Sequence, residues 1–144
     1  MSGFVLDCSV TAAWLLEDEV VSDAEIVLDS LLTLTAHVPT IWHLEIGNVL
    51  LKTLRRGRIS ANAFQLLVKE LEALPVVTDG ETEIQSFGDT LDIARRYSLT
   101  TYDAAYLELA VRLDLPLATL DKALVRTAAE IGVKTIPDQT SGSV

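Results

Sequence analysis

The stretch Gly3-Phe-Val-Leu-Asp-Cys-Ser9 decides the expected fold, because an apolar run ends there abruptly on a charged side chain. Gly3–Leu6 is typical of a short buried strand that ends at Asp7. An unpaired charge is costly inside such an apolar stretch, so Asp7 requires a specific reason. It either caps the helix that follows, which is a common role for aspartate, or takes part in a polar site.

Working outward from this strand, short apolar segments alternate with helical patterns. Further strands are expected at 37–39, 76–78, 117–119 and 134–136. Helices are expected at 11–16, 23–34, 41–56, 61–74, 84–97, 101–113 and 122–131, with Thr40 and Ser60 as N-caps. This alternation predicts an α/β fold of three layers, α/β/α, with a short-stranded, mainly parallel sheet of four to five strands. In such sheets, sites form beyond the carboxyl ends of the strands.

The length of 144 residues fits one domain, expected at 1–137, with a flexible tail at 138–144. Hydrophobic residues make up 49% and charged residues 22%, which excludes an intrinsically disordered chain. Apolar runs are far too short for a membrane span. The first positive side chain is Lys52, so no secretory signal is expected. Cys8, the single cysteine, fits a reducing cytoplasm.

The net charge of −10, from 11 basic and 21 acidic residues, argues by itself against nucleic-acid binding. The distribution is uneven, however, because residues 1–51 contain no Lys or Arg and four cations then fall within seven residues. These are Lys52, Arg55, Arg56 and Arg58. Two interpretations stay open: cations that complement a helix dipole, and contacts to RNA phosphates.

Asp7 and Asp121 each follow a predicted strand, and both are expected at the carboxyl edge of the sheet. Asp121 is also a natural cap for the helix that begins at Lys122. Asp103 shares its helical face with Tyr106 and Leu107, so it lies on the buried stripe of its helix. Its position in the first turn favours the helix dipole but does not explain the apolar face.

Glu45 is a similar anomaly, because its helix is apolar almost all round and is expected to be largely buried. A hydrogen bond to Asn48 is the ordinary explanation, since Lys52 lies two turns away. Each acid can be explained singly. Together they would repel one another at one low-dielectric edge, and a divalent cation removes that penalty. Oxygen ligands without a suitable histidine or thiolate favour Mg²⁺ or Mn²⁺, which suits phosphodiester hydrolysis.

Four motifs together resemble those of the PIN domain. They are Phe4-Val-Leu-Asp-Cys-Ser9, Trp42-His-Leu-Glu-Ile-Gly-Asn48, Leu99-Thr-Thr-Tyr-Asp-Ala-Ala-Tyr-Leu-Glu-Leu-Ala110 and Leu117-Ala-Thr-Leu-Asp121. The resemblance covers almost the whole chain, and a short free-standing chain of this kind resembles the VapC-type toxins of bacterial toxin–antitoxin pairs. It implies an Mg²⁺- or Mn²⁺-dependent endoribonuclease, cytoplasmic and usually homodimeric, that is held inactive in a hetero-oligomer by a VapB-type antitoxin.

The resemblance also implies residue roles. Asp7, Glu45, Asp103 and Asp121 would be the catalytic acids around the metal. Ser9, Asn48 and Thr119 would orient carboxylates or waters. The alternative is a catalytically inert PIN-like module that binds RNA or protein. A receiver domain needs paired acids after the first strand, and a haloacid-dehalogenase-like phosphatase needs Asp-x-Asp, so Asp7-Cys-Ser9 argues against both.

Overall fold

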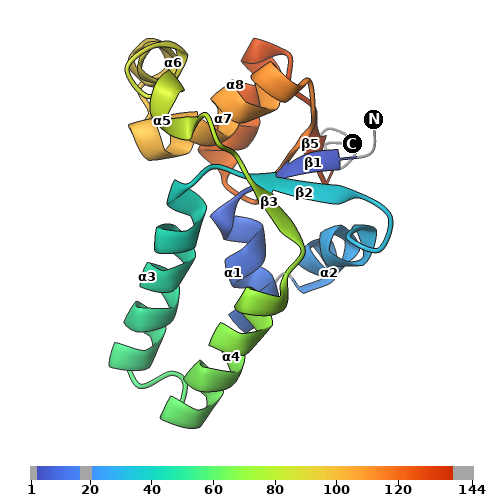
Figure 1. The fold of residues 1–144 in the computed structure, drawn as a ribbon, viewed down its shortest axis with the longest axis vertical. Helices are drawn as coiled ribbons and strands as arrows, with labels where there is room; N and C mark the ends of the chain where they lie inside the picture. Colours follow the sequence, from blue (N-terminus) through green and yellow to red (C-terminus); the bar gives the residue numbers. More distant parts are fainter. Residues whose placement is uncertain (1–2, 17–20, 138–144) are drawn as a thin grey trace.

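The computed structural model describes residues 3–16 and 21–137, so the expected flexible tail at 138–144 lies outside the described residues (Figure 1). In the described part, five strands form one sheet in which every pairing is parallel. They are β1 (Gly3–Leu6), β2 (Thr35–Val38), β3 (Val76–Thr78), β4 (Leu117–Ala118) and β5 (Thr135–Ile136). The predicted parallel α/β fold is confirmed.

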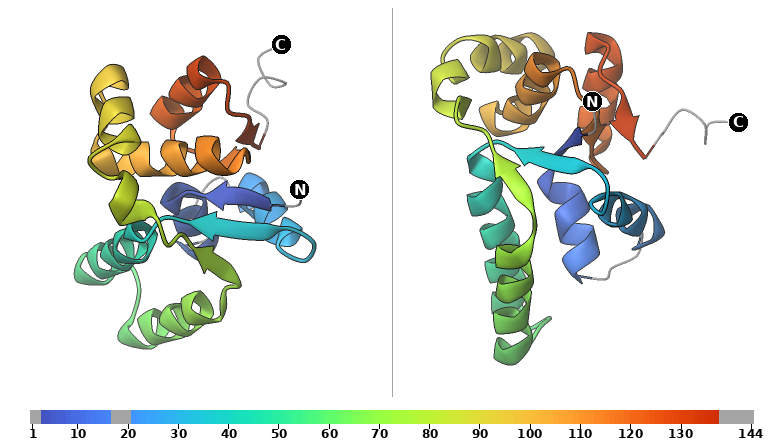
Figure 2. Two further views of the ribbon diagram at one scale, coloured as in Figure 1. Left: turned by 45° about the horizontal axis from the view of Figure 1, so that its top comes forward. Right: turned by 45° about the vertical axis from the view of Figure 1, so that its right-hand side comes forward.

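Eight helices in the described ranges cover the sheet. They are α1 (Cys8–Leu16), α2 (Val21–Ser30), α3 (Ile41–Arg55), α4 (Ala61–Ala73), α5 (Thr82–Gln85), α6 (Asp89–Tyr97), α7 (Thr101–Leu113) and α8 (Lys122–Ile131). Helices α1 to α4 lie on one side of the sheet and α5 to α8 on the other, as Figures 1 and 2 show. The three layers are therefore those expected.

The strand order β3-β2-β1-β4-β5 places β1 in the centre. After β1 the chain adds β2 and β3 on one side, and later adds β4 and β5 on the other side. The connections that leave β1 and β4 therefore diverge, and this is the point at which parallel sheets form binding sites. Asp7 directly follows β1, and Thr119 directly follows β4. The topology thus brings two of the sequence motifs to one place.

The core lies against β1 and α7. Phe4 and Val5 are fully buried, as expected of a central strand that is covered on both faces. Helix α7 packs on β1 and is buried from Ala104 to Ala110. Its buried residues include the charged Glu108. Glu108 is tolerated there because Arg112, one turn later, bonds to its carboxylate.

The expectation that α3 is largely buried is wrong. Only Trp42, Ile46 and Leu50 are buried, and Leu44 is 69% exposed. The reason is that α3 and α4 project beyond the sheet as a hairpin, so α3 meets the core along one stripe only (Figure 1). An apolar cavity of about 460 Å³ lies between the two helices.

Two local details of the helices also differ from expectation. The single helix expected at 84–97 is two helices, α5 and α6. The Ser86 hydroxyl donates to the carbonyl of Glu83, and Gly88 adopts a non-helical ψ of −112°, so the chain turns between them. Thr40 precedes α3 but its side chain accepts no capping bond, whereas Ser60 caps α4 as predicted, through Ala63 N at 3.0 Å.

Candidate metal centre

Asp7 is the most buried acid of the predicted set, with 5% of its surface exposed. The hydroxyls of Ser9 and Thr119 both donate to its Oδ2, at 2.6 and 2.7 Å. The Ser9 hydroxyl in turn accepts from the backbone N–H of Leu120 at 2.9 Å. These bonds join the segment after β1 to the segment after β4, and they hold the Asp7 carboxylate in one orientation.

Hydrogen bonds fix both the backbone and the side chain of Asp121. Its backbone N–H donates to Thr119 Oγ1 at 3.0 Å. Its Oδ1 accepts from the backbone N–H groups of Ala123 and Leu124 at 2.9 and 3.1 Å, which caps α8. Both capping bonds use Oδ1, so Oδ2 takes part in neither. The capping interpretation therefore holds, and it leaves one oxygen of Asp121 for another partner.

Asp103 lies in the first turn of α7, where the side chain of Thr100 accepts from its backbone N–H at 3.1 Å. One turn further along, the buried Tyr106 directs its hydroxyl at Glu45 Oε1 and donates a short hydrogen bond. Glu45 belongs to α3, so this bond ties α3 to α7 across 61 residues.

Tyr106 is the residue of the candidate site that sequence reasoning did not single out. Its helical position assigns it to the core, and it is fully buried as that position implies. A buried tyrosine hydroxyl needs a hydrogen-bond partner, however, and this requirement was the available signal. Asp103 and Tyr106 are three residues apart on one face of α7, so the helix presents an acid and an acid-orienting hydroxyl side by side.

The electrostatics place the four acids in one neighbourhood. Burial raises the pKa of Asp7, and the charge of Asp121 raises it further. Burial also raises the pKa of Asp103, with added contributions from Asp121 and Asp7. The pKa of Glu45 is likewise raised by burial, with Asp7 and Asp103 adding to the effect, while the Tyr106 bond opposes it. Asp7, Glu45 and Asp103 thus each experience the charge of at least one other acid of the set.

Cys8 follows Asp7 but is not a nucleophile. Burial, together with the charges of Asp7 and Glu45, raises the pKa of its thiol to about 12. The thiol therefore stays protonated at neutral pH, and thiolate is the reactive form.

Carboxylate oxygens in this arrangement suit a hard divalent cation such as Mg²⁺. No Lys, Arg or His in the described ranges forms an ion pair with any of the four acids. As the side chains stand, no three acidic, histidine or cysteine groups among the described residues form a ready ligand cage. The hydroxyl and amide bonds explain this, because they hold Asp7, Glu45 and Asp121 to the protein rather than to one common point.

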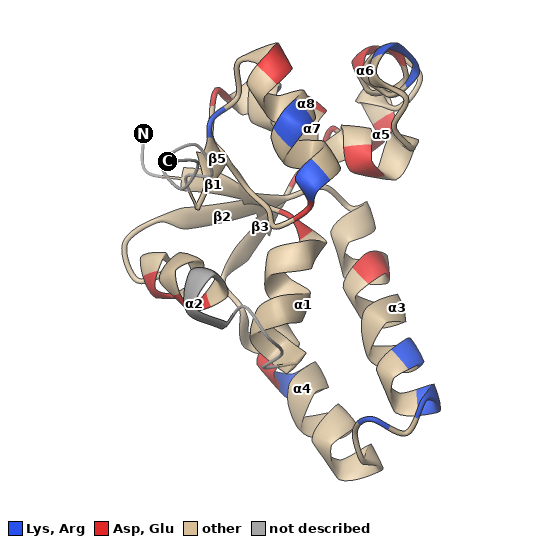
Figure 3. Ribbon diagram, turned by 180° about the vertical axis from the view of Figure 1, so that it is seen from behind, with Lys and Arg blue, Asp and Glu red and all other residues tan. Residues whose placement is uncertain are grey.

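Asn48 and the four cations predicted from the sequence are exposed on α3 and the turn that follows it, unlike the four acids. Asn48 is exposed, forms no hydrogen bond to Glu45 among the described residues, and lines the cavity between α3 and α4. Lys52, Arg55, Arg56 and Arg58 are also exposed, and they gather at the far end of the α3–α4 hairpin (Figure 3). We call these four residues the basic tip. It lies at the end of α3 that is remote from β2, the strand that precedes the helix.

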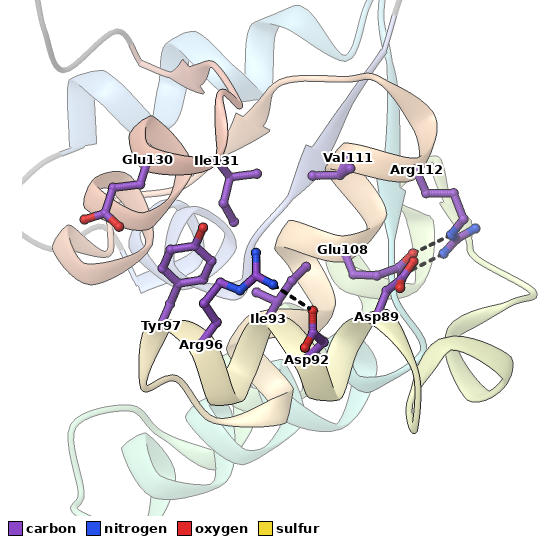
Figure 4. Close-up of a pocket in the computed structure, with 10 residues that line it drawn as sticks. All are labelled: Asp89, Asp92, Ile93, Arg96, Tyr97, Glu108, Val111, Arg112, Glu130 and Ile131. Carbon is purple, nitrogen blue, oxygen red and sulfur yellow. Dashed lines mark hydrogen bonds and ion pairs between the residues drawn. The ribbon is translucent and has the colours of Figure 1, made fainter.

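A second polar region lies between α6, α7 and α8, around a cavity of about 520 Å³ (Figure 4). Its walls carry the buried Arg112–Glu108 pair and an exposed ion pair between Arg96 and Asp92. None of the four predicted site acids lines this cavity. It is therefore separate from the candidate metal centre.

Fold and site together define a class: parallel α/β domains that gather carboxylates where the strand order reverses. The sequence model of the PIN domain matches residues 4–130, so the chain belongs to the PIN domain family. PIN domains are generally nucleases. The comparison with curated proteins gave no match. No helix in the described part is long and apolar enough to cross a bilayer.

Three solved structures share the fold. PAE2754 from Pyrobaculum aerophilum is 27% identical, with a TM-score of 0.64 over 88% of this chain and 79% of that one. A toxin-antitoxin complex from Klebsiella pneumoniae is 16% identical, with a TM-score of 0.60 over 89% and 92%. FitAcB from Neisseria gonorrhoeae is 18% identical, with a TM-score of 0.60 over 92% and 96%.

Proposed function

We propose that this protein is a divalent-metal-dependent endoribonuclease, the cytoplasmic toxin of a VapBC-type toxin–antitoxin pair. The observation that carries the proposal is the cluster of four carboxylates without an internal counter-cation. Such a cluster is unfavourable by itself, and a divalent cation converts it into a catalytic centre. Membership of the PIN domain family and the presence of all four motifs support the same reaction class.

In this proposal Asp7, Glu45, Asp103 and Asp121 hold Mg²⁺ or Mn²⁺. The side chains of Glu45, Asp103 and Asp121 are partly exposed, so an ion from solution would have access to them beside the buried Asp7. A bound ion would supply a Lewis acid beside the scissile phosphate and would invert the local field that otherwise repels RNA.

Side chains of the protein are proposed to orient the acids and to accept a proton. Ser9 and Thr119 fix the Asp7 carboxylate by donating to Oδ2. Tyr106 fixes Oε1 of Glu45, so Oε2 remains as the oxygen that accepts a proton from the attacking water. Asn48, on the same helix as Glu45, is proposed to orient water or substrate from the solvent side.

The proposed partners are RNA, a second copy of the chain, and a VapB-type antitoxin. The similar fold in the Klebsiella pneumoniae toxin-antitoxin complex supports the antitoxin. A basic segment of such a partner would be attracted to the uncompensated acids and would compete with metal and substrate for them.

The test uses the purified chain free of any partner. We expect it to cleave a structured RNA in Mn²⁺ or Mg²⁺ and to stop in EDTA. Asp103→Asn is expected to lower the rate by about 10²–10³-fold, since it removes a preorganised charge from the centre. The exposed Asp89 on α6 offers a matched control, and Asp89→Asn should cleave at the wild-type rate.

Thermal unfolding separates the proposal from an inert binding module. Mn²⁺ at about 100 times its Kd would stabilise the folded protein by roughly 2.7 kcal/mol. An unfolding midpoint that ignores millimolar Mn²⁺, together with no cleavage, would favour the inert module. If Asp7→Asn and Asp103→Asn both cleave at the wild-type rate, the catalytic assignment is wrong.

A further inference from the structure

The basic tip is a concentration of positive charge that the described contacts do not neutralise. All four of its side chains are exposed, and none of them takes part in the ion pairs of the described residues. In a chain with a net charge of −10, four neighbouring cations provide a local site for an anionic ligand.

The helix dipole does not explain the whole basic tip. The helix dipole stabilises cations in the last turn of a helix, and this effect falls off within that turn. Lys52 and Arg55 are in the last turn of α3, but Arg56 is the C-cap and Arg58 lies beyond Gly57, which adopts a left-handed φ of 71°. Two of the four cations are therefore outside the helix that they would stabilise.

The basic tip is aligned with the candidate metal centre. Lys52 follows Glu45 by seven residues, close to two full helical turns, so the two share one face of α3, and Arg56, the C-cap, follows Glu45 by eleven residues at the end of that face. At 1.5 Å per residue Lys52 and Arg56 lie about 10 and 16 Å from Glu45 along the helix axis. This face of α3 therefore leads from the acids to the cations.

We propose that Lys52 and Arg56 bind the phosphate backbone of single-stranded RNA that flanks the scissile bond. The inference rests on the proposed ribonuclease function and adds a length requirement to it. At a stacked spacing of roughly 3.4 Å per nucleotide, the cations correspond to about three to five nucleotides from the cleaved phosphate. Efficient substrates therefore carry a single-stranded flank of at least that length on one side.

Cleavage of oligonucleotides with graded flanks tests this requirement. Single-stranded RNAs share one cleavage site and carry one to eight nucleotides on either side. Extension past about five nucleotides on one side is expected to raise kcat/KM at least tenfold through KM, because phosphate contacts far from the reacting bond contribute uniform binding. Lys52→Gln combined with Arg56→Gln should remove this gain and leave cleavage of the short RNAs unchanged.

A matched control removes the same charge elsewhere. Lys69 on α4 and Arg95 on α6 are exposed and unpaired within the described ranges, so Lys69→Gln combined with Arg95→Gln should keep the length dependence. Equal kcat/KM for short and long RNAs in the wild type, or the same loss in the control, would overturn the length requirement while leaving the ribonuclease proposal standing.

RNA binding provides a readout that is independent of cleavage. In a chain carrying Asp7→Asn and Asp103→Asn, fluorescence anisotropy in EDTA gives the dependence of binding on monovalent salt. Loss of two phosphate contacts lowers the slope of log K against log salt by about 1.4. An unchanged slope in the Lys52→Gln/Arg56→Gln chain would overturn the proposal, whether or not the wild type cleaves RNA. Loss of self-association with an unchanged slope would assign the basic tip to a protein contact instead.

Discussion

Two clusters in this molecule bring acidic side chains close together, and they differ in whether a cation of the protein neutralises the acids. One is the candidate metal centre with Asp7, Glu45, Asp103 and Asp121. The other joins Asp79, which follows β3, to Glu108 on α7, with Arg112 between them. Both bring carboxylates from distant parts of the chain to the sheet and its covering helices. Only the second contains its own cation.

We call the second group, Asp79, Glu108 and Arg112, the arginine cluster, and its two acids are both bound by the arginine. Arg112 donates to both oxygens of Asp79, at 3.1 and 2.7 Å, and to both oxygens of Glu108, at 2.7 and 3.0 Å. Burial raises the pKa of Asp79, but the bonds and charge of Arg112, together with bonds from the Glu81 backbone and the Thr82 hydroxyl, outweigh burial and lower that pKa below its ordinary value. In the candidate metal centre the pKa values of Asp7, Glu45 and Asp103 are all raised.

This contrast suggests a criterion that separates acids neutralised by the protein from acids that stay available to an external cation. Two hydrogen bonds from one arginine neutralise a carboxylate, so that carboxylate requires no cation from solution. Hydroxyl and amide donors orient a carboxylate without neutralising it, so the charge remains available for an external cation. The identity of the hydrogen-bond donors distinguishes the two clusters.

Removing the internal cation should have the largest effect. Arg112→Met leaves Asp79 and Glu108 buried and unpaired, with 9% and 5% of their side chains exposed. We expect the free energy of unfolding to fall by about 3 kcal/mol in urea titrations. The control is Arg96→Met, because its ion pair with Asp92 is 66% and 63% exposed and should contribute less than about 1 kcal/mol. Equal losses in both variants would contradict the comparison.

Removing an orienting hydroxyl from the metal centre should have an intermediate effect. Tyr106→Phe deletes the donor to Glu45 while keeping the buried ring, so Mn²⁺ affinity is expected to fall about 10- to 100-fold. Calorimetric Mn²⁺ titration measures this loss, and Tyr97→Phe on α6 is the control. If Tyr106→Phe no longer changes Mn²⁺ affinity in a chain that already carries Glu45→Gln, the hydroxyl acts through Glu45. A loss of stability without any change in Mn²⁺ affinity would make Tyr106 a packing residue only.

The pH dependence of stability should be the smallest effect, and it has opposite signs in the two clusters. Because the folded pKa of Asp7 is raised, the folded state keeps its proton longer than the unfolded state. Without metal, stability is therefore lost as pH rises from the ordinary value of 3.8 through the raised pKa. For Asp79, stability is instead lost as pH falls through its lowered pKa.

Urea titrations at a series of pH values in EDTA measure these slopes. Asp7→Asn should remove the loss at higher pH, whereas Asp79→Asn should remove the loss at low pH. A steeper decline at higher pH in Asp7→Asn would contradict the assigned direction.

Much of the fold could be predicted because its signals are local. The bounds of β1, β3, α7 and α8 follow from apolar runs and helical periodicity, which depend on neighbouring residues. The break between α5 and α6 was missed, because the pattern through Gly88 stays amphipathic while its backbone leaves the helix. The exposure of α3 was also missed, since burial depends on where the hairpin projects.

The parallel α/β architecture and the candidate acids can be inferred from the sequence, because alternating short segments and charges at apolar positions are visible within a few residues. Which of the acids are neutralised depends on the folded structure. The Tyr106–Glu45 bond spans 61 residues and the Arg112–Asp79 pair spans 33, and no local pattern specifies either one. Packing of the layers determines which residues meet at that separation in the sequence. The bonding partners of each carboxylate, and so its neutralisation, therefore follow from the folded structure.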